Sequence, residues 1–139
     1  MKAFKNATTF FHNCESAKGW EACKEFAIEN AKFNAQSEPI TDVTKLEDYV
    51  NWMKGLGSIT MPGCSYKVHS SAYDETTSTA LFFATFTGTH SGDGGPIPPS
   101  NKTTNSEYVY ALKMNDDDKV ESMTKIWNSS WALRELGWM

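Results

Sequence analysis

His90 is the residue of this sequence best suited to acid–base chemistry. It ends a run of alternating apolar residues and is followed at once by a Gly- and Pro-rich segment, Ser91 to Asn105. The ordinary pKa of imidazole lies near neutrality, so a histidine at the edge of an apolar site can act as a general acid or base. A histidine that only bonds a loop carbonyl at a strand end is the structural alternative.

Asn128 is the second candidate, and it lies where a strand pattern over 119–128 gives way to a short helical pattern over 130–136. An amide donates and accepts hydrogen bonds but does not accept a proton at neutral pH, which limits Asn128 to anchoring a carbonyl or hydroxyl group. Asn is also a favoured helix cap, and this role stays open. Tyr108 and Tyr110 carry hydroxyl groups that can either donate into a cavity or bond at the edge of a packed core.

The charge balance argues against nucleic acid as a partner. The chain has 13 basic and 17 acidic residues, a net charge of −4 and no cluster of Lys and Arg, whereas binding to phosphates needs a basic face. Neither a metal nor a cofactor is implied. Cys14, Cys23 and Cys64 show no metal-ligand spacing and are expected to be reduced thiols in the core, and the consecutive acids Asp116 to Asp118 fit a solvated turn.

No membrane segment or export signal is predicted. No apolar run approaches the roughly 20 residues that a membrane-spanning helix needs, and Met1 to Glu15 mixes Lys, Asn and His with apolar residues. We therefore expect a cytoplasmic protein, and the length of 139 residues fits one domain, 1–139. The aromatic content of 13% predicts large side chains around a core or along the walls of a cavity.

Helical periodicity predicts three helices in the N-terminal half of the chain. The first covers 2–15 and has an apolar stripe formed by Ala3, Ala7, Phe10, Phe11 and Cys14. A second, short helix follows, with Trp20, Cys23 and Phe26. A short strand over 31–37 then precedes a third helix, whose apolar stripe runs from Leu46 to Leu56.

Alternating patterns predict four longer strands, over 66–73, 77–90, 105–114 and 119–128. In the second of them one face holds Ala80, Phe82, Ala84, Phe86, Gly88 and His90, and the other face is also largely apolar. We expect helices to cover one face of the sheet and a second copy of the chain to cover the other. In the last strand we expect the core-facing set to include Asn128, together with Val120, Ser122, Thr124 and Ile126.

The segment Ser91 to Asn105 is long for a connection between neighbouring strands. It contains no Gly-x-Gly-x-x-Gly frame and no helix follows it, so it does not fit a phosphate-binding loop. A rim or lid over a pocket and an ordinary exposed loop are both consistent with its composition.

Six segments form a recognisable series when taken in chain order. They are Trp20 to Gln36, Phe86 to His90, Gly94 to Pro99, Tyr108 to Tyr110, Lys125 to Asn128 and Leu133 to Gly137. In this order they resemble the SnoaL-like branch of the nuclear transport factor 2-like superfamily, and the resemblance covers most of the chain. It implies an α+β fold of the cystatin-like type. In this fold a curved antiparallel sheet wraps round N-terminal helices to form a cone with a deep apolar cavity.

The resemblance also implies partners and chemistry. Members of this family often pair as homodimers through the outer face of the sheet, and they include polyketide cyclases, ketosteroid isomerases, dehydratases and binding proteins. In the cyclases an Asp near the end of the last strand removes a proton next to a carbonyl. The position that matches it here is Asn128, so this sequence lacks the family's base at that place.

Three functions follow as hypotheses. The first is a cofactor-free cyclase or isomerase acting on a small apolar carbonyl compound, with His90 as acid and base and Asn128 polarising the carbonyl. Its ligand-binding residues would be Tyr108, Tyr110, Phe86 and Trp20. The second is a non-catalytic module that binds a small apolar molecule, and the third is a dimerising scaffold. A carboxylate that reaches the cavity from a helix, such as Glu21, Glu25 or Asp42, would restore a base.

Overall fold

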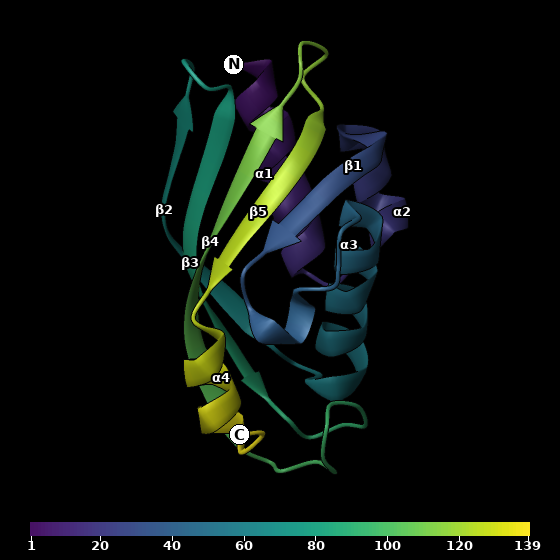
Figure 1. Cartoon of the computed structure of the whole chain (residues 1–139), viewed down its shortest axis with the longest axis vertical. Helices are drawn as coiled ribbons and strands as arrows, with labels where there is room; N and C mark the ends of the chain where they lie inside the picture. The colour runs from purple at the N-terminus through teal and green to yellow at the C-terminus, as the bar shows by residue number, and fades with distance from the viewer.

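A single curved sheet organises the computed structural model, which describes residues 1–139. Its five strands lie in the order β1-β5-β4-β3-β2 (Figure 1). They are β1 Ala27–Ala35, β2 Ser65–Asp74, β3 Thr79–Thr89, β4 Thr103–Met114 and β5 Val120–Trp127. All neighbours pair antiparallel except β1, which lies parallel to β5 at the sheet edge. The predicted α+β class and the curved sheet are confirmed.

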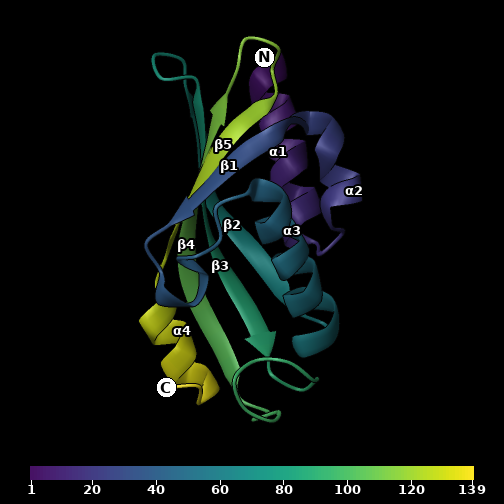
Figure 2. The same cartoon turned by 45° about the vertical axis from the view of Figure 1, so that its right-hand side comes forward.

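The helices fall into two groups around this sheet. They are α1 Lys2–Glu15, α2 Trp20–Cys23, α3 Leu46–Gly55 and α4 Ser129–Leu136, and a π-helical turn over Leu56–Thr60 extends α3. Figure 2 shows α1, α2 and α3 together on one side of the sheet, while α4 lies at the far end beside β4. The sheet and the three N-terminal helices therefore enclose the core between them.

The core forms because the apolar stripe of α1 meets the inner face of β3. The stripe residues Ala3, Ala7, Phe10, Phe11 and Cys14 are all buried, as predicted. Phe11 stacks on Phe82 with ring centroids 4.5 Å apart. The alternation predicted for β3 is confirmed from Ala80 to Gly88.

A β-bulge corrects the faces predicted for the last strand. Lys113 pairs with Ser122 but Met114 pairs with Val120, so Glu121 is one additional residue on β5. Such a residue moves every later side chain of its strand to the opposite face. The core face therefore passes from Val120 to Met123, Lys125 and Trp127. Ile126 is 65% exposed and Asn128 is also exposed, so their predicted core-facing position is wrong.

The outer face of the sheet carries an apolar row that no helix covers. Phe83 pairs with Val109, which pairs in turn with Ile126, so the three side chains lie side by side across β3, β4 and β5. Phe83 and its neighbour Leu81 are each more than a third exposed. No helix of the structure is long and apolar enough to cross a membrane.

Candidate active site

A small apolar cavity lies between the sheet and the helices. The space open to the centre of a water-sized sphere measures about 40 Å³. One water needs roughly 10–15 Å³ of such space, so the cavity is larger than a single water. Ten apolar residues line it: Pro39, Trp52, Met53, Leu56, Met61, Phe86, Trp127, Ala132, Leu136 and Trp138. The polar groups that reach this apolar wall belong to Glu15, Thr104, Ser106, Tyr108 and Lys125.

Glu15 brings a carboxyl group to this cavity from the last position of α1. It follows Phe11 by four residues, so both lie on the helix face that meets the sheet. Only 3% of Glu15 is exposed. The Tyr108 hydroxyl donates a hydrogen bond of 2.6 Å to Glu15 Oε2, while Oε1 is buried without any partner. Such an unpaired buried oxygen is rare in folded proteins and marks a site that can accept a hydrogen bond or a proton from a ligand.

The environment of Glu15 changes its acidity. Burial raises the pKa of the Glu15 carboxyl above its ordinary value, because a carboxylate loses hydration in an apolar cavity. The charge of Lys125 and the hydrogen bond from Tyr108 oppose this rise in pKa without cancelling it. Burial also raises the pKa of Tyr108, so its hydroxyl stays protonated and acts as a donor.

Lys125 faces the same cavity from β5 and is only 6% exposed. Its Nζ donates a hydrogen bond of 2.9 Å to the Tyr49 hydroxyl, which is itself bonded to the hydroxyl of Tyr110. Burial lowers the pKa of Lys125 to about 8, and the nearby Glu15 charge opposes this effect. A Lys with a pKa near neutrality can exchange a proton under physiological conditions.

Five aromatic rings surround the Lys125 ammonium group. Nζ lies 4.4 Å from the centroid of the Trp127 ring, and the other four centroids lie at 5.1 to 5.7 Å. The four rings belong to Tyr49, Trp52, Tyr108 and Tyr110. Ring faces attract a cation within about 6 Å of their centroid, so this aromatic cage replaces part of the hydration that burial removes.

Glu15 and Lys125 do not form a salt bridge with each other. The one salt bridge of the structure joins Glu21 and Lys24 on the surface at 2.7 Å. Two opposite charges thus reach one cavity from different elements and leave a gap between them. Buried charges without a direct partner are costly and cluster at functional sites, which makes this pair the strongest candidate for the chemical centre.

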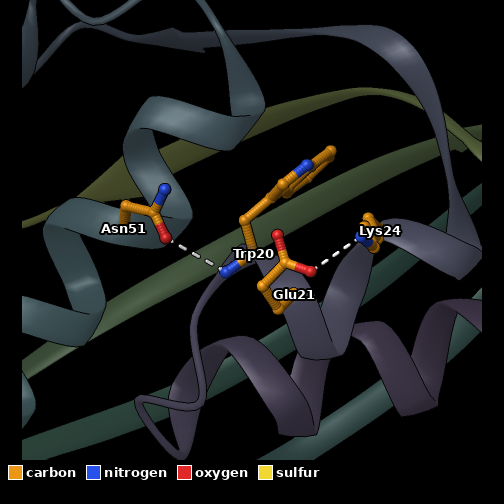
Figure 3. Close-up of polar contacts among 4 residues, drawn as sticks. All are labelled: Trp20, Glu21, Lys24 and Asn51. Atoms are coloured by element: carbon orange, nitrogen blue, oxygen red, sulfur yellow. Dashed lines mark hydrogen bonds and ion pairs between the residues drawn. The ribbon is translucent and has the colours of Figure 1, made fainter.

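Two of the predicted ligand-binding residues lie in the cavity wall and two do not. Phe86 and Tyr108 line the cavity. Tyr110 is fully buried outside the lining and takes part in the hydroxyl network with Tyr49. Figure 3 shows Trp20 at the start of α2, where its backbone N–H donates to Asn51 Oδ1 at 3.1 Å. Trp20 also lies outside the cavity lining.

His90 is fully buried but does not line the cavity. The Trp138 indole N–H donates to His90 Nδ1 at 2.9 Å, so Nδ1 acts as an acceptor. Nε2 must then carry the proton, and it donates to the Gly94 carbonyl oxygen at 2.9 Å. Both ring nitrogens thus hold structural partners, in a clamp between the loop after β3 and the C-terminal end of the chain.

The clamp predicts a stability effect for His90→Ala. Removal of the ring leaves the Trp138 N–H and the Gly94 carbonyl unpaired and creates a void, so we expect the free energy of unfolding to fall by about 2–4 kcal/mol. Urea unfolding measures this change, with the exposed His69→Ala as the control. A stable His90→Ala variant whose turnover falls about 100-fold would instead favour the catalytic role predicted from the sequence.

Asn128 lies at the N-cap position of α4 and is exposed. Its backbone carbonyl accepts from the Ala132 N–H and its backbone N–H donates to the Glu107 carbonyl, both at 3.2 Å. Its side chain makes no capping hydrogen bond, and it does not line the cavity. The catalytic assignments of His90 and Asn128 stay predictions.

The two charged residues of the site were missed from the sequence for different reasons. Glu15 lies at the edge of the apolar stripe of α1, where a charged residue normally turns to solvent. The alternating pattern placed Lys125 on the face opposite Asn128, and the bulge reverses which of these faces meets the core. A carboxylate does reach the cavity from a helix, but it belongs to Glu15. The three residues considered from the sequence, Glu21, Glu25 and Asp42, are all exposed.

The loop after β3 lies at the rim of an outer pocket that adjoins the cavity. Trp52, Leu56 and Trp138 line both spaces, and Gly94 and Gly95 line the outer one. A Cβ on Gly95 would meet the Trp138 ring at 2.7 Å, so the loop approaches this ring more closely than a larger residue allows. This position is consistent with a rim, one of the two interpretations of the segment, although most residues of the loop are exposed, as in an ordinary surface loop.

The cysteines and acidic residues form no alternative centre. No group of three or more His, Cys, Asp and Glu side chains is placed to hold a metal ion. Cys14 and Cys23 are buried, as expected for core thiols, whereas Cys64 is only partly buried. Burial raises the pKa of each thiol, and a protonated thiol is a weak nucleophile.

Solved structures of other proteins share this fold, and three of them illustrate the similarity. A protein assigned as a SnoaL-like polyketide cyclase, from Jannaschia sp. CCS1, aligns with a TM-score of 0.78 at 14% identity over 97% of this chain and 91% of that chain. IdmH from Streptomyces antibioticus, assigned as a polyketide cyclase, gives 0.74 at 13% identity over 99% of both chains. AclR from Streptomyces galilaeus, assigned as a hydroxylase, gives 0.77 at 17% identity over 99% of this chain and 85% of that chain.

These similarities confirm the fold predicted from the sequence, which is that of the SnoaL-like and nuclear transport factor 2-like proteins. No family model and no sequence of a curated protein matches the chain. Because two of these proteins are assigned as cyclases and the third as a hydroxylase, the shared fold does not identify the reaction of this chain. The chemistry has to be derived from the cavity and its side chains.

Proposed function

We propose that this protein binds a small apolar carbonyl compound and moves a proton at the carbon next to the carbonyl, as a cyclase or isomerase does. The observation that carries the proposal is the unpartnered Glu15 Oε1 in the same apolar cavity as Lys125. A carboxylate beside a cation, in a space that excludes bulk water, is the arrangement that such a proton transfer needs.

Each polar group has a distinct part in this reaction. Glu15 Oε1 accepts the proton, while the Tyr108 hydroxyl holds Oε2 and so fixes the orientation of the carboxyl group. The Lys125 ammonium group faces the cavity and attracts the negative charge that develops on the carbonyl oxygen. The raised pKa of Glu15 makes it a better base and brings its protonation closer to neutral pH, where proton transfer in both directions is efficient.

Glu15 also has a route for proton exchange with solvent. Besides the inner cavity, it lines a surface pocket formed with Ser16, Ala17, Gly57, Cys64, Ser65 and Tyr66. A proton taken from the substrate can therefore leave by this side while the substrate stays in place.

Exchange of α-protons for deuterium tests this function without knowledge of the natural substrate. A panel of small ketones, such as acetone and cyclopentanone, is incubated with the protein in D₂O and followed by NMR. We expect at least one ketone to incorporate deuterium faster with the wild-type protein than with Glu15→Gln. Tight binding of ketones with no exchange above the buffer rate would support the non-catalytic binder instead.

The dimer predicted from the sequence belongs to this proposal as well. We propose that two copies pair through the outer face of the sheet, because the apolar row of Phe83, Val109 and Ile126 is uncovered. The cytoplasmic location likewise stays a prediction.

Substitution in this row tests the pairing. Phe83→Lys places a charge in the centre of the proposed interface, so we expect a mainly monomeric protein where the wild type sediments as a dimer. Sedimentation velocity measures the difference, and Lys5→Glu, an exposed change on α1 away from the outer face of the sheet, serves as the control. A wild-type protein that stays monomeric at high concentration would contradict the pairing.

A further inference from the structure

The Lys125 amine has few partners and can therefore act as a nucleophile as well as a positive charge. Its Nζ uses one hydrogen bond, to Tyr49, and no carboxylate pairs with it directly. The same residue lines the cavity that also presents Glu15 and Tyr108. We propose that Lys125 forms a covalent imine with the carbonyl carbon of a small apolar aldehyde or ketone; this inference rests on the proposed function and names its reaction intermediate.

The aromatic cage fits the charged form of this intermediate. A protonated imine carries its positive charge near the position of the ammonium group, where five ring faces already surround Nζ. Ring faces stabilise a cation without donating a hydrogen bond that would compete for the nitrogen. The apolar wall around them limits the water that would hydrolyse the imine.

The neutral amine is available because of the same burial. A pKa of about 8 leaves roughly a tenth of the lysine unprotonated at neutral pH, on the order of 100-fold more than an ordinary lysine has. Desolvation of an amine in an apolar pocket is an established way to activate a nucleophilic lysine.

The steps balance with the groups that the cavity provides. The amine attacks the carbonyl carbon, a C–N bond forms, and one amine proton moves to the former carbonyl oxygen. Glu15, which has taken up the proton that the Lys125 ammonium group loses, then gives this proton to the hydroxyl group. The C–O bond breaks, water leaves, and the second amine proton stays on the nitrogen of the protonated imine. The Glu15 carboxylate formed in this step is the base that removes the α-proton to give an enamine.

Glu15 and Lys125 both border the Tyr108 side chain. The Tyr108 ring lies close to both, since its hydroxyl bonds Glu15 and its centroid is 5.6 Å from Lys125 Nζ. A substrate bound to Nζ would therefore lie in the same cavity as the carboxyl group. The small volume of the cavity, about 40 Å³, selects short aldehydes and ketones in the absence of side-chain movement.

Reductive trapping tests the imine directly. The wild-type protein is incubated at neutral pH with limiting propanal and sodium cyanoborohydride, which reduces an imine to a stable secondary amine. We expect mass spectrometry to find a propyl group on Lys125 and peptide mapping to show this site labelled about tenfold faster than exposed lysines, because more of its amine is free. Lys119→Arg, which removes an exposed lysine just before β5, should leave the labelling of Lys125 unchanged.

A second measurement separates this inference from the proposed function. Lys125→Arg keeps the positive charge but cannot form an imine, so we expect it to lose both the propyl label and the α-deuterium exchange. If the wild type exchanges α-protons while propanal labels Lys125 no faster than exposed lysines, the imine is overturned and the proton transfer stands. If propanal labels Lys125 selectively and no ketone exchanges, the imine stands and the proposed proton transfer fails.

Discussion

Glu15→Gln is expected to reduce α-proton exchange by about 100- to 10,000-fold, the range that a positioned general base contributes. Gln has the shape of Glu and can still accept the hydrogen bond from the Tyr108 hydroxyl, but its amide cannot take a proton. The loss should therefore appear in the rate of exchange, with ketone binding largely kept. NMR exchange rates and a ketone binding titration on the same samples measure the two effects separately.

The control for this variant is Glu29→Gln, which replaces an exposed carboxylate on β1. We expect it to exchange α-protons at the wild-type rate. If Glu15→Gln also exchanges at the wild-type rate while it remains folded, Glu15 is not the base. In that case His90 would be the first acid–base candidate to test, since it is the one buried histidine of the chain.

The pH profile of the wild type should follow the two charged groups of the cavity. The exchange rate should rise with pH as Glu15 loses its proton, and this limb should lie above the ordinary carboxyl range because burial raises the pKa of Glu15. For direct proton transfer the rate should fall again as Lys125 loses its positive charge at a pH of about 8, whereas a route through the imine needs the neutral amine and should show no such fall. The two limbs belong to the pair rather than to either residue alone, because the charges interact.

The sequence was a good guide to the elements and a poor one to the charged residues of the site. The apolar stripe of α1 and the alternation in β3 are strong periodic signals, and both helix and strand lie where these signals predict. The early strand starts at Ala27 rather than at residue 31 and pairs with β5. A parallel partner 90 residues away leaves no local pattern in the sequence.

The charged residues were missed because burial overrides what a residue type suggests. A Lys in a strand normally turns to solvent, and only the register shift at Glu121 shows that Lys125 turns inward. His90 illustrates the converse case. It lies at the end of the apolar face where it was predicted, but the partners that hold both ring nitrogens come from Gly94 and from Trp138, far along the chain.

The second large effect concerns stability, because a site that buries two charges weakens the fold that holds it. The double variant Glu15→Gln/Lys125→Met should be inactive and yet more stable than the wild type at neutral pH. Replacement of a buried ionic pair by uncharged residues is often neutral or stabilising, by about 1–4 kcal/mol. Met also suits the aromatic cage, since its thioether packs well against rings.

Each single variant should gain less stability than the double, or lose some. Glu15→Gln removes the negative charge that favours the protonated form of Lys125, and Lys125→Met removes the positive charge that opposes the raised pKa of Glu15. Either change leaves one buried charge without its counterpart. Urea unfolding of the wild type, both single variants and the double variant gives the coupling free energy between the two residues.

The pH dependence gives this prediction its sharpest form. A carboxyl group whose pKa is raised by folding costs nothing at low pH, and its cost grows as pH rises from 4.5 through the raised pKa. A lysine whose pKa is lowered from 10.5 to about 8 costs most below pH 8, and its cost disappears as pH rises to 10.5. Both costs act together only near neutral pH. The stability advantage of the double variant should therefore be largest near neutral pH and shrink toward acid and alkaline pH. A double variant that is less stable than the wild type at neutral pH would instead mean that the two charges stabilise the fold.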